Sequence, residues 1–315
     1  MPTLEHGETE AGELVLAGLR WAFGVTLVVL VLEAIGAFLS RSLSLTVDAV
    51  HNIPDLLAFA VSWFALSATE RGASDRFTFG VHRFEVFAGL LNAALVLGTG
   101  AAFGYEAVST LLRSTTFAGP VDAFWLLLVA LPTLALRGAN LVLFGRVPRR
   151  TRDLNLRSVV VHLASDILIT AALIAAAVLL LVHPAWTGAD AAGAITISAI
   201  LVYESLPLFR DGMDVLTERT PRNLSVRAIE QAAHAIPHVV ELHDLHVWAV
   251  CPTLVCMTAH VEVDEMSLRD SMQVVAELRA RMAEEFGILH AVFEVEAGPA
   301  GHSATDGPRT GQDPA

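Results

Sequence analysis

The chain has 315 residues, of which 54% are hydrophobic and only 17% are charged, and its mean hydropathy is +0.57. A soluble domain carries about 25% charged residues, so this composition excludes a single soluble globule and, for most of the length, a disordered chain. The formal net charge of −13 argues against nucleic acid as a partner, because proteins neutralise phosphates with a basic surface. The two cysteines cannot supply a disulfide framework.

Charge is divided unevenly between two parts of the chain. Residues 211–315 hold 17 of the 33 acidic side chains, 7 of the 20 basic side chains and 7 of the 12 histidines. This distribution indicates an apolar first part followed by an acidic, histidine-bearing soluble part.

Six stretches of the first part are long and apolar enough to cross a bilayer, which requires about 20 residues of helix. They run over residues 15–39, 43–69, 84–112, 121–146, 153–182 and 189–210. Arginines gather after the second, fourth and sixth stretches, which places both termini in the cytoplasm. The sequence therefore predicts a multi-pass protein of the inner (plasma) membrane, with a cytosolic tail over 1–13 and a six-helix transmembrane domain over 14–210.

Several ionisable residues fall inside these stretches, and we expect them to be interfacial or packing residues. Arg137 comes 16 residues into the fourth stretch, about 24 Å along a helix, where its side chain can extend to the inner membrane surface. Glu33 and Glu106 fall near the outer ends of their stretches, and Glu85 falls near an inner end.

Residues 211–297 have the pattern of a small α+β domain. Helical periodicity covers 222–236 and 267–286, and strand-like alternation covers 239–250, 254–263 and 288–296. Ser267 is placed to begin the second helix and Gly287 to end it. This order suits two layers, with the helices on one side of a sheet. Residues 298–315 are typical of a disordered tail.

Two His–Asp pairs recur at helical spacing inside the predicted spans, namely His51 with Asp55 and His162 with Asp166. Residues four apart share one face of a helix. Because an ionisable group at mid-bilayer costs about 2.5–3.5 kcal/mol or more, a dication shared by the pairs would offset their burial. Two imidazoles and two carboxylates form a tetrahedral ligand set that suits zinc. The competing interpretation is that each pair only ties helices together through hydrogen bonds.

Other polar residues share the faces of these pairs. Asp48 lies three residues before His51, where it can guide ions or protons, or cap the start of a helix. Asn155 and Ser158 share the His162 face and are candidates to support the ligands, or to make an ordinary interhelical contact. Pro54 removes a backbone hydrogen bond and can kink the helix beside the site, although membrane helices tolerate proline.

Four motifs follow one another along the chain. They are SLSLTVDAVHNIPD, FTFGVHRFEVFAGLLNA, NLRSVVVHLASD, and VVELHDLHVWAV followed by TAHVEV and ILHAVFEVE. Together and in this order they resemble the cation diffusion facilitator family, in particular its zinc-type branch, over about residues 15–297. One departure is that the segment RVPRRTRD lacks the histidines found there in many zinc-type members.

The resemblance implies a homodimeric exporter that exchanges cytosolic zinc for protons by alternating access, with a ferredoxin-like cytosolic domain. It implies that the transport site consists of His51, Asp55, His162 and Asp166. A broader exporter of cadmium, cobalt, nickel or manganese is the alternative within the family.

The resemblance also implies a regulatory zinc site in the cytosolic domain. Its residues would be His243, His260 and His290, and Glu294 and Glu296 are candidate carboxylate partners. The competing interpretation is that these histidines serve the fold and the dimer, and that the two glutamates are exposed strand residues.

The sequence also bears on two functions outside transport. An intramembrane zinc hydrolase needs an open coordination position and a general base, whereas four ligands complete this set and no HExxH motif is present, so we expect no enzyme. A membrane zinc sensor that does not transport remains an alternative. The expected partners are therefore divalent metal ions, protons, membrane lipid and a second copy of the chain.

Overall fold

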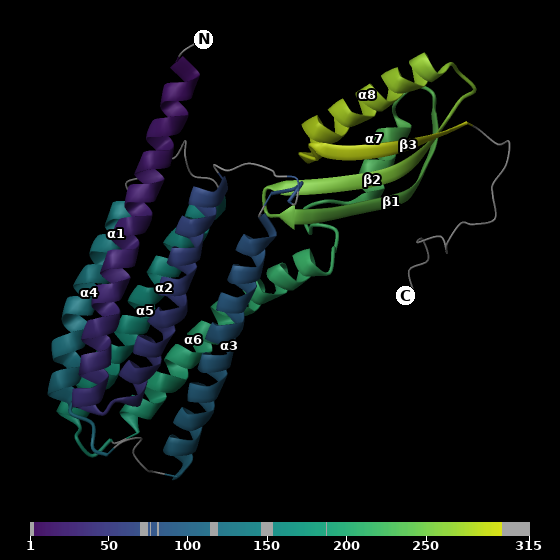
Figure 1. The fold of residues 1–315 in the computed structure, drawn as a ribbon. Coiled ribbons are helices and arrows are strands. Elements are labelled where there is room, and N and C mark those ends of the chain that lie inside the picture. Colours follow the sequence, from purple (N-terminus) through teal and green to yellow (C-terminus); the bar gives the residue numbers. More distant parts are fainter. Residues whose placement is uncertain are drawn as a thin grey trace. The chain divides into compact units, whose positions relative to one another are not determined.

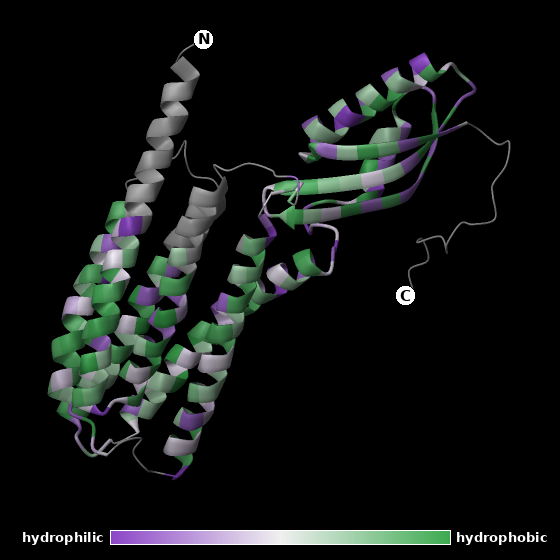
Figure 2. Ribbon diagram, viewed as in Figure 1, coloured by the Kyte–Doolittle hydropathy of each residue, from purple (hydrophilic) through white to green (hydrophobic). Residues whose placement is uncertain are grey.

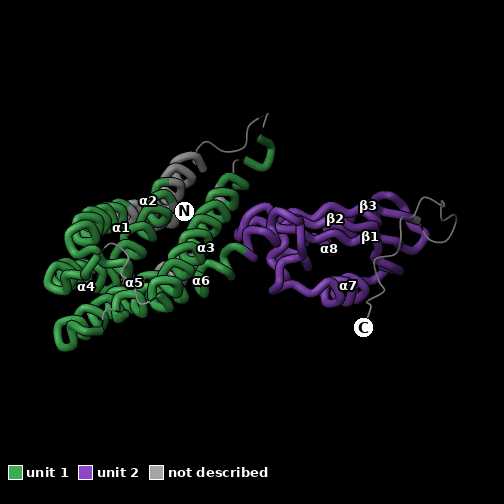
Figure 3. Tube along the Cα trace, turned by 90° about the horizontal axis from the view of Figure 1, so that it is seen from below, with its two compact units in different colours: residues 1–209 green, residues 210–315 purple. Residues whose placement is uncertain are grey.

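The computed structural model describes residues 3–69, 75, 77–80, 82–113, 119–145, 154–186 and 188–297. These residues form two compact units, which divide between Phe209 and Arg210 (Figure 3). The predicted tail over 298–315 lies outside the described residues.

The first unit is a bundle of long helices, as the six apolar stretches predict (Figure 1). They are α1 (Thr3–Ser40), α2 (Leu43–Thr69), α3 (His82–Arg113), α4 (Ala123–Gly145), α5 (Leu154–Val182) and α6 (Ala189–Leu216). Within the described residues, five of these helices, all except α2, are long and apolar enough to cross a membrane. α2 carries the cluster of polar residues Asp48, His51, Asn52 and Asp55.

The surface of the first unit is apolar, and several of its charged groups are inside. Large apolar side chains such as Phe38, Leu112 and Tyr203 are exposed, whereas Glu33 and Asp48 are fully buried. The apolar colouring continues along the helices of this unit in Figure 2. Such an arrangement suits a lipid environment, where polar groups must be satisfied inside the protein. The chain is therefore a multi-pass membrane protein.

The first turn of α2 is fixed by an acidic residue from a distant helix. The Asp190 carboxylate of α6 accepts hydrogen bonds from the backbone N–H of Leu43 at 2.6 Å and of Ser44 at 3.3 Å. It also accepts bonds from the hydroxyls of Ser42 and Ser44, both at 2.5 Å. A helix leaves its first N–H groups unpaired and carries a partial positive charge there, so a carboxylate stabilises this end.

The second unit has the predicted order α-β-β-α-β. Its elements are α7 (Val226–His234), β1 (Val239–Cys251), β2 (Leu254–Val263), α8 (Leu268–Phe286) and β3 (His290–Ala297). β2 lies in the middle of the sheet, antiparallel to β1 and parallel to β3.

Both helices of the second unit pack on the sheet and on each other around one apolar core (Figure 1). The core includes Ile229 of α7, Leu278 of α8 and Met257 of β2. The ends of α8 confirm the predicted signals: the Ser267 side chain accepts a hydrogen bond from the N–H of Asp270, and Gly287 adopts φ +68°, which glycine reaches without steric cost.

Candidate metal centres

The two His–Asp pairs of α2 and α5 come together inside the first unit. The Nε2 atom of His51 lies 3.3 Å from Oδ2 of Asp55 and 3.8 Å from Oδ1 of Asp166. The Nε2 atom of His162 lies 3.5 Å from the same Asp55 oxygen. The two imidazole rings are 6.0 Å apart between centroids. Each helix therefore contributes one imidazole and one carboxylate to a common point, as the spacing of four residues predicts.

The distances and the missing partners both fit a metal ion. Four ligands placed about 2.0–2.2 Å from zinc in a tetrahedron lie about 3.3–3.6 Å from one another. Among the described residues, neither ring nitrogen of His51 nor Oδ1 of Asp166 has a hydrogen-bond partner, although all three atoms are buried. An unpaired buried polar atom is costly, and ligation of a cation by these atoms would remove that cost.

Burial differs among the four ligands. Relative exposure is 3% for His51, 6% for Asp55 and 8% for Asp166, whereas the side chain of His162 is 33% exposed. His51, Asp55 and Asp166 form the tight group, with ligand atoms that all lie within 4.8 Å of one another, and His162 stands at its more open side. The side chains of Asn155 and Ser158, predicted to support the ligands, lie outside the described residues.

Arg137, expected near the inner membrane surface, is instead paired in the interior with Asp48 and Glu33. The Arg137 guanidinium is only 3% exposed and does not reach the interface. It donates to both carboxylate oxygens of Asp48, at 2.9 and 3.0 Å, and lies 3.4 Å from Oε1 of Glu33. Asp48 therefore does not cap a helix start. The interfacial prediction was wrong for Arg137, because ion pairing between helices satisfies its charge more directly than an extended side chain would.

A second cluster of metal-ligating groups lies on the sheet of the second unit. His243 of β1 and His260 of β2 are register partners, and their ring centroids are 5.3 Å apart. Glu296 of β3 joins them: its Oε2 lies 3.1 Å from Nε2 of His243, and its Oε1 lies 2.8 Å from Nδ1 of His260. These three residues present ligand atoms within 4.8 Å of one another.

Carboxylates flank this cluster at slightly longer range. Oδ2 of Asp244 and Oε2 of Glu294 each lie 3.7 Å from Nε2 of His260. Asp244 has φ +47° and lies where the β1–β2 register shifts between His243 and His246. An irregularity of this kind re-aims a side chain, and here it turns a strand residue toward the site.

The structure does not bring His290 to this cluster. His290 pairs with Cys256 in the β2–β3 register, whereas the partner of His260 is Glu294. Four residues of strand separate His290 from Glu294, about 13 Å. Alternation along β3 puts His290 on the correct face but at the wrong end of the strand, so Glu296 takes the place that the resemblance gives to His290.

The hydrogen bond between Glu296 and His260 shifts the pKa of both groups. It raises the pKa of the His260 imidazole above its usual value and lowers the pKa of the Glu296 carboxyl below its own. A metal ligated by His260 must displace that proton, so metal and proton compete at this cluster.

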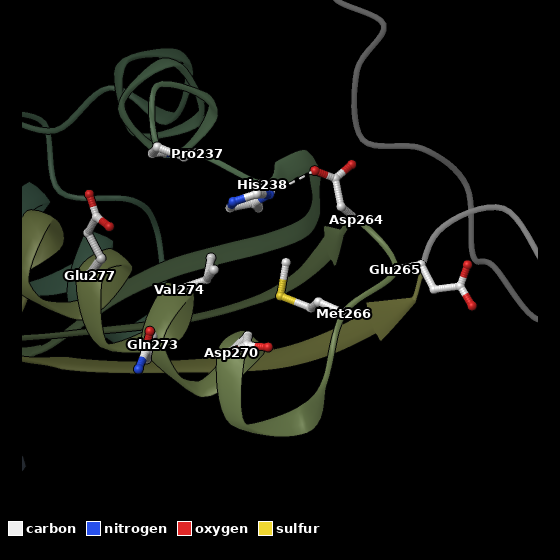
Figure 4. Close-up of a pocket in the computed structure, with 9 residues that line it drawn as sticks. All are labelled: Pro237, His238, Asp264, Glu265, Met266, Asp270, Gln273, Val274 and Glu277. Atoms are coloured by element: carbon white, nitrogen blue, oxygen red, sulfur yellow. Dashed lines mark hydrogen bonds and ion pairs between the residues drawn. The ribbon is translucent and has the colours of Figure 1, made fainter.

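A pocket with acidic lining lies elsewhere in the second unit (Figure 4). In it, Nδ1 of His238 lies 3.0 Å from a carboxylate oxygen of Asp264. The side chains of Glu265 and Glu277 stand apart from this pair in Figure 4. This arrangement is an exposed ion pair rather than a convergent ligand set.

Comparison with known proteins gives matches along most of the chain. The family model for the cation efflux transmembrane domain matches residues 19–217, and that for the cation efflux protein cytoplasmic domain matches residues 221–297. The zinc transporter ZitB of Pectobacterium atrosepticum is 30% identical over 294 residues, which cover 92% of this chain and 88% of that protein. The metal cation efflux system protein CzcD of Cupriavidus metallidurans is 28% identical over 282 residues, covering 89% and 86%.

Among solved structures, the metal-bound C-terminal domain of the CzcD transporter of Cupriavidus metallidurans is 30% identical, with a TM-score of 0.22. The match covers 23% of this chain and 99% of the chain in that structure. The two family matches account for the membrane helices and for the α-β-β-α-β unit in turn. The chain therefore belongs to the cation diffusion facilitator family of cation efflux proteins, and is a transporter rather than an enzyme.

Proposed function

We propose that this protein exports zinc from the cytoplasm in exchange for protons, using His51, Asp55, His162 and Asp166 as the transport site. One observation carries the proposal: two His–Asp pairs from α2 and α5 converge in a buried site, where the nitrogens of His51 and Oδ1 of Asp166 have no hydrogen-bond partner among the described residues. Names of relatives support the cargo, since two of the proteins named above are a zinc transporter and a metal cation efflux protein.

The chemistry of the ligand set supports both exchange and selectivity. Neutral imidazoles and ionised carboxylates bind zinc, and protons compete for the same atoms because the ordinary pKa of imidazole is near 6.5. Exposure of the site to one side of the membrane and then to the other would turn this competition into antiport. Mixed nitrogen and oxygen donors favour zinc over magnesium or calcium, which prefer all-oxygen sets.

A broader cargo is the second candidate. A relative from Bacillus subtilis, 28% identical over 272 residues, is named a cadmium, cobalt and zinc/H(+)-K(+) antiporter. A two-histidine, two-carboxylate site also accommodates these metals, because selectivity among divalent transition metals depends on geometry, ligand type and metal availability rather than on raw affinity.

The second unit is proposed as a cytosolic regulatory and dimerisation domain over residues 211–297. Support comes from the match to the cation efflux cytoplasmic domain and from the cluster of His243, His260 and Glu296. In this proposal both termini are cytoplasmic, two copies pair, and zinc at the cluster raises transport when cytosolic zinc is high.

Growth in zinc tests the export function. A bacterial strain that lacks its own zinc exporters should grow at higher zinc when it expresses this protein. The Asp166→Ala variant, expressed to the same level in the membrane, should give no protection. Protection by both proteins alike would show that transport does not need Asp166 as a ligand. Parallel cultures in cadmium, cobalt and manganese separate a zinc exporter from a broader one.

A further inference from the structure

A second buried polar cluster lies next to the proposed transport site and connects four helices. Its centre is Arg137 of α4, which forms a bidentate ion pair with the Asp48 carboxylate of α2. Glu33 of α1 lies 3.4 Å from the guanidinium, and its other oxygen accepts a hydrogen bond from Nδ2 of Asn52 at 2.6 Å. Thr170 of α5 accepts from Nη1 of Arg137 at 2.5 Å. All five side chains are buried.

The guanidinium also contacts the backbone of a proposed metal ligand. Nη1 of Arg137 donates to the carbonyl oxygen of Asp166 at 3.1 Å, and the Thr170 hydroxyl donates to the same oxygen at 2.9 Å. On the other side, Asp48 lies three residues, or about one helical turn, before His51. One guanidinium therefore joins α2 and α5 close to the ligands that each helix supplies.

Stability alone does not explain this cluster. A buried ion pair usually contributes little net free energy, because desolvation offsets the attraction between the charges. Such a pair does fix the relative positions of its partners. The planar guanidinium of arginine donates two hydrogen bonds to one carboxylate, a bidentate contact that lysine cannot form. The guanidinium also keeps its charge at any physiological pH, so it remains in place when metal and protons come and go.

We propose that Arg137 is a positioning residue for the transport site, which it serves by holding Asp166 and the His51 turn of α2 at ligating distance. The proposal rests on the proposed function, since it assumes that these residues bind the cargo. In this proposal Arg137 supplies no ligand and affects metal affinity and coordination geometry through the residues that it holds.

The test measures metal binding by the full-length protein in detergent, in a His260→Ala background that removes the cytosolic cluster. Cobalt is the probe, because its visible absorption spectrum reports coordination geometry, and zinc affinity is obtained by competition with cobalt. The variants are Arg137→Lys and Arg137→Met. Arg113→Lys, at the exposed end of α3, is the matched control.

Both Arg137 variants should weaken zinc binding about 10–100-fold and change the cobalt spectrum, as loss of a residue that orients metal ligands does. In reconstituted vesicles they should raise KM more than they lower kcat, whereas Arg113→Lys should behave as the parent. Folded Arg137 variants with the parent's zinc affinity and cobalt spectrum would overturn the proposal.

A variant without unpaired charges covers the case in which the single variants do not fold. Glu33→Gln, Asp48→Asn and Arg137→Met together remove all three buried charges and leave none uncompensated. Weak zinc binding with an altered spectrum in this folded protein supports the positioning role, and parent-like binding refutes it. The Asp55→Asn variant in the same background tests the site itself: if it keeps full binding, the proposed function fails, independently of Arg137.

Discussion

Among the proposed ligands, the Asp55 carboxylate is close to both histidines, since one of its oxygens lies 3.3 Å from Nε2 of His51 and 3.5 Å from Nε2 of His162. It is almost fully buried, so water cannot replace it as a ligand without a change in packing. The connection between the two imidazoles therefore passes through this residue.

Replacement of Asp55 by Asn should reduce zinc affinity by more than about 100-fold, beyond the effect expected for a residue that only supports a ligand. The amide keeps the size of the side chain but removes the charge that zinc needs. Titration of purified protein with zinc measures the change. Glu106→Gln, an exposed change on α3, should leave affinity as it was, and a parent-like affinity for Asp55→Asn would refute the ligand assignment.

At the cytosolic cluster, the Glu296→Gln change should lower the pKa of His260 toward its ordinary value, because the hydrogen bond to the carboxylate is what raises it. The folded-state pKa of His260 lies above the unfolded value of about 6.5. Its contribution to stability is therefore present below that pH and is lost as pH rises through the folded pKa.

Proton NMR of selectively labelled histidine rings, followed from pH 5 to 9, measures this shift. The resonance of His234, on α7, serves as the internal reference. An unchanged pKa of His260 in the Glu296→Gln variant would show that the Glu296 carboxylate does not raise the pKa of this ring.

Sequence alone brings the two proposed His–Asp pairs to notice and misses the Arg137 cluster beside them, because the residues of that cluster are far apart along the chain. His51 with Asp55 and His162 with Asp166 are local pairs, and a spacing of four residues is enough to put each on one helical face. Arg137 and Asp48 are 89 residues apart, so their contact depends on how α2 packs against α4 and α5. Hydropathy places Arg137 near a membrane surface and gives no sign of a buried partner.

At the scale of elements, the start of α2 is stabilised by a tertiary contact in addition to its own sequence, in which the Ser42 hydroxyl accepts a hydrogen bond from the N–H of Leu45 at 3.1 Å. The Asp190 carboxylate of α6 accepts hydrogen bonds from the N–H groups of Leu43 and Ser44 and from the hydroxyls of Ser42 and Ser44. This contact fixes the end of the helix that carries His51 and Asp55.

The Asp190→Ala change should therefore destabilise the first unit by about 1–3 kcal/mol, the cost of leaving buried donors without an acceptor. Thermal unfolding in detergent measures the loss as a lower Tm, and Glu106→Gln provides the comparison for an exposed acidic residue. Parent-like unfolding of Asp190→Ala would mean that water or another group satisfies the helix end.

The order of helices and strands in the second unit can be predicted from periodicity. The pairing register of its strands, which decides which side chains meet, cannot. The order α-β-β-α-β follows from alternating patterns, and Ser267 and Gly287 mark the ends of α8. Glu296, rather than His290, lies at the cluster because of the parallel register of β3 on β2, which the alternating pattern does not determine.

At the scale of the whole molecule, the two units carry two different kinds of candidate metal centre. The membrane site is buried and draws two ligands from each of two helices, which suits a cargo that must be enclosed and then released. The cytosolic cluster is half-buried on a sheet, with more carboxylates in reach, which suits reversible sensing of the metal in bulk solvent.

In the proposed function, metal crosses the membrane at the four-ligand site in exchange for protons. This exchange is tested by zinc flux into vesicles that contain the purified protein and a zinc-sensitive dye, with the interior more acidic than the exterior. We predict zinc uptake that grows with the proton gradient, is accompanied by proton efflux, and is lost in Asp166→Ala. Folded protein that binds zinc but carries no flux at any gradient, or equal flux through Asp166→Ala, would contradict the account.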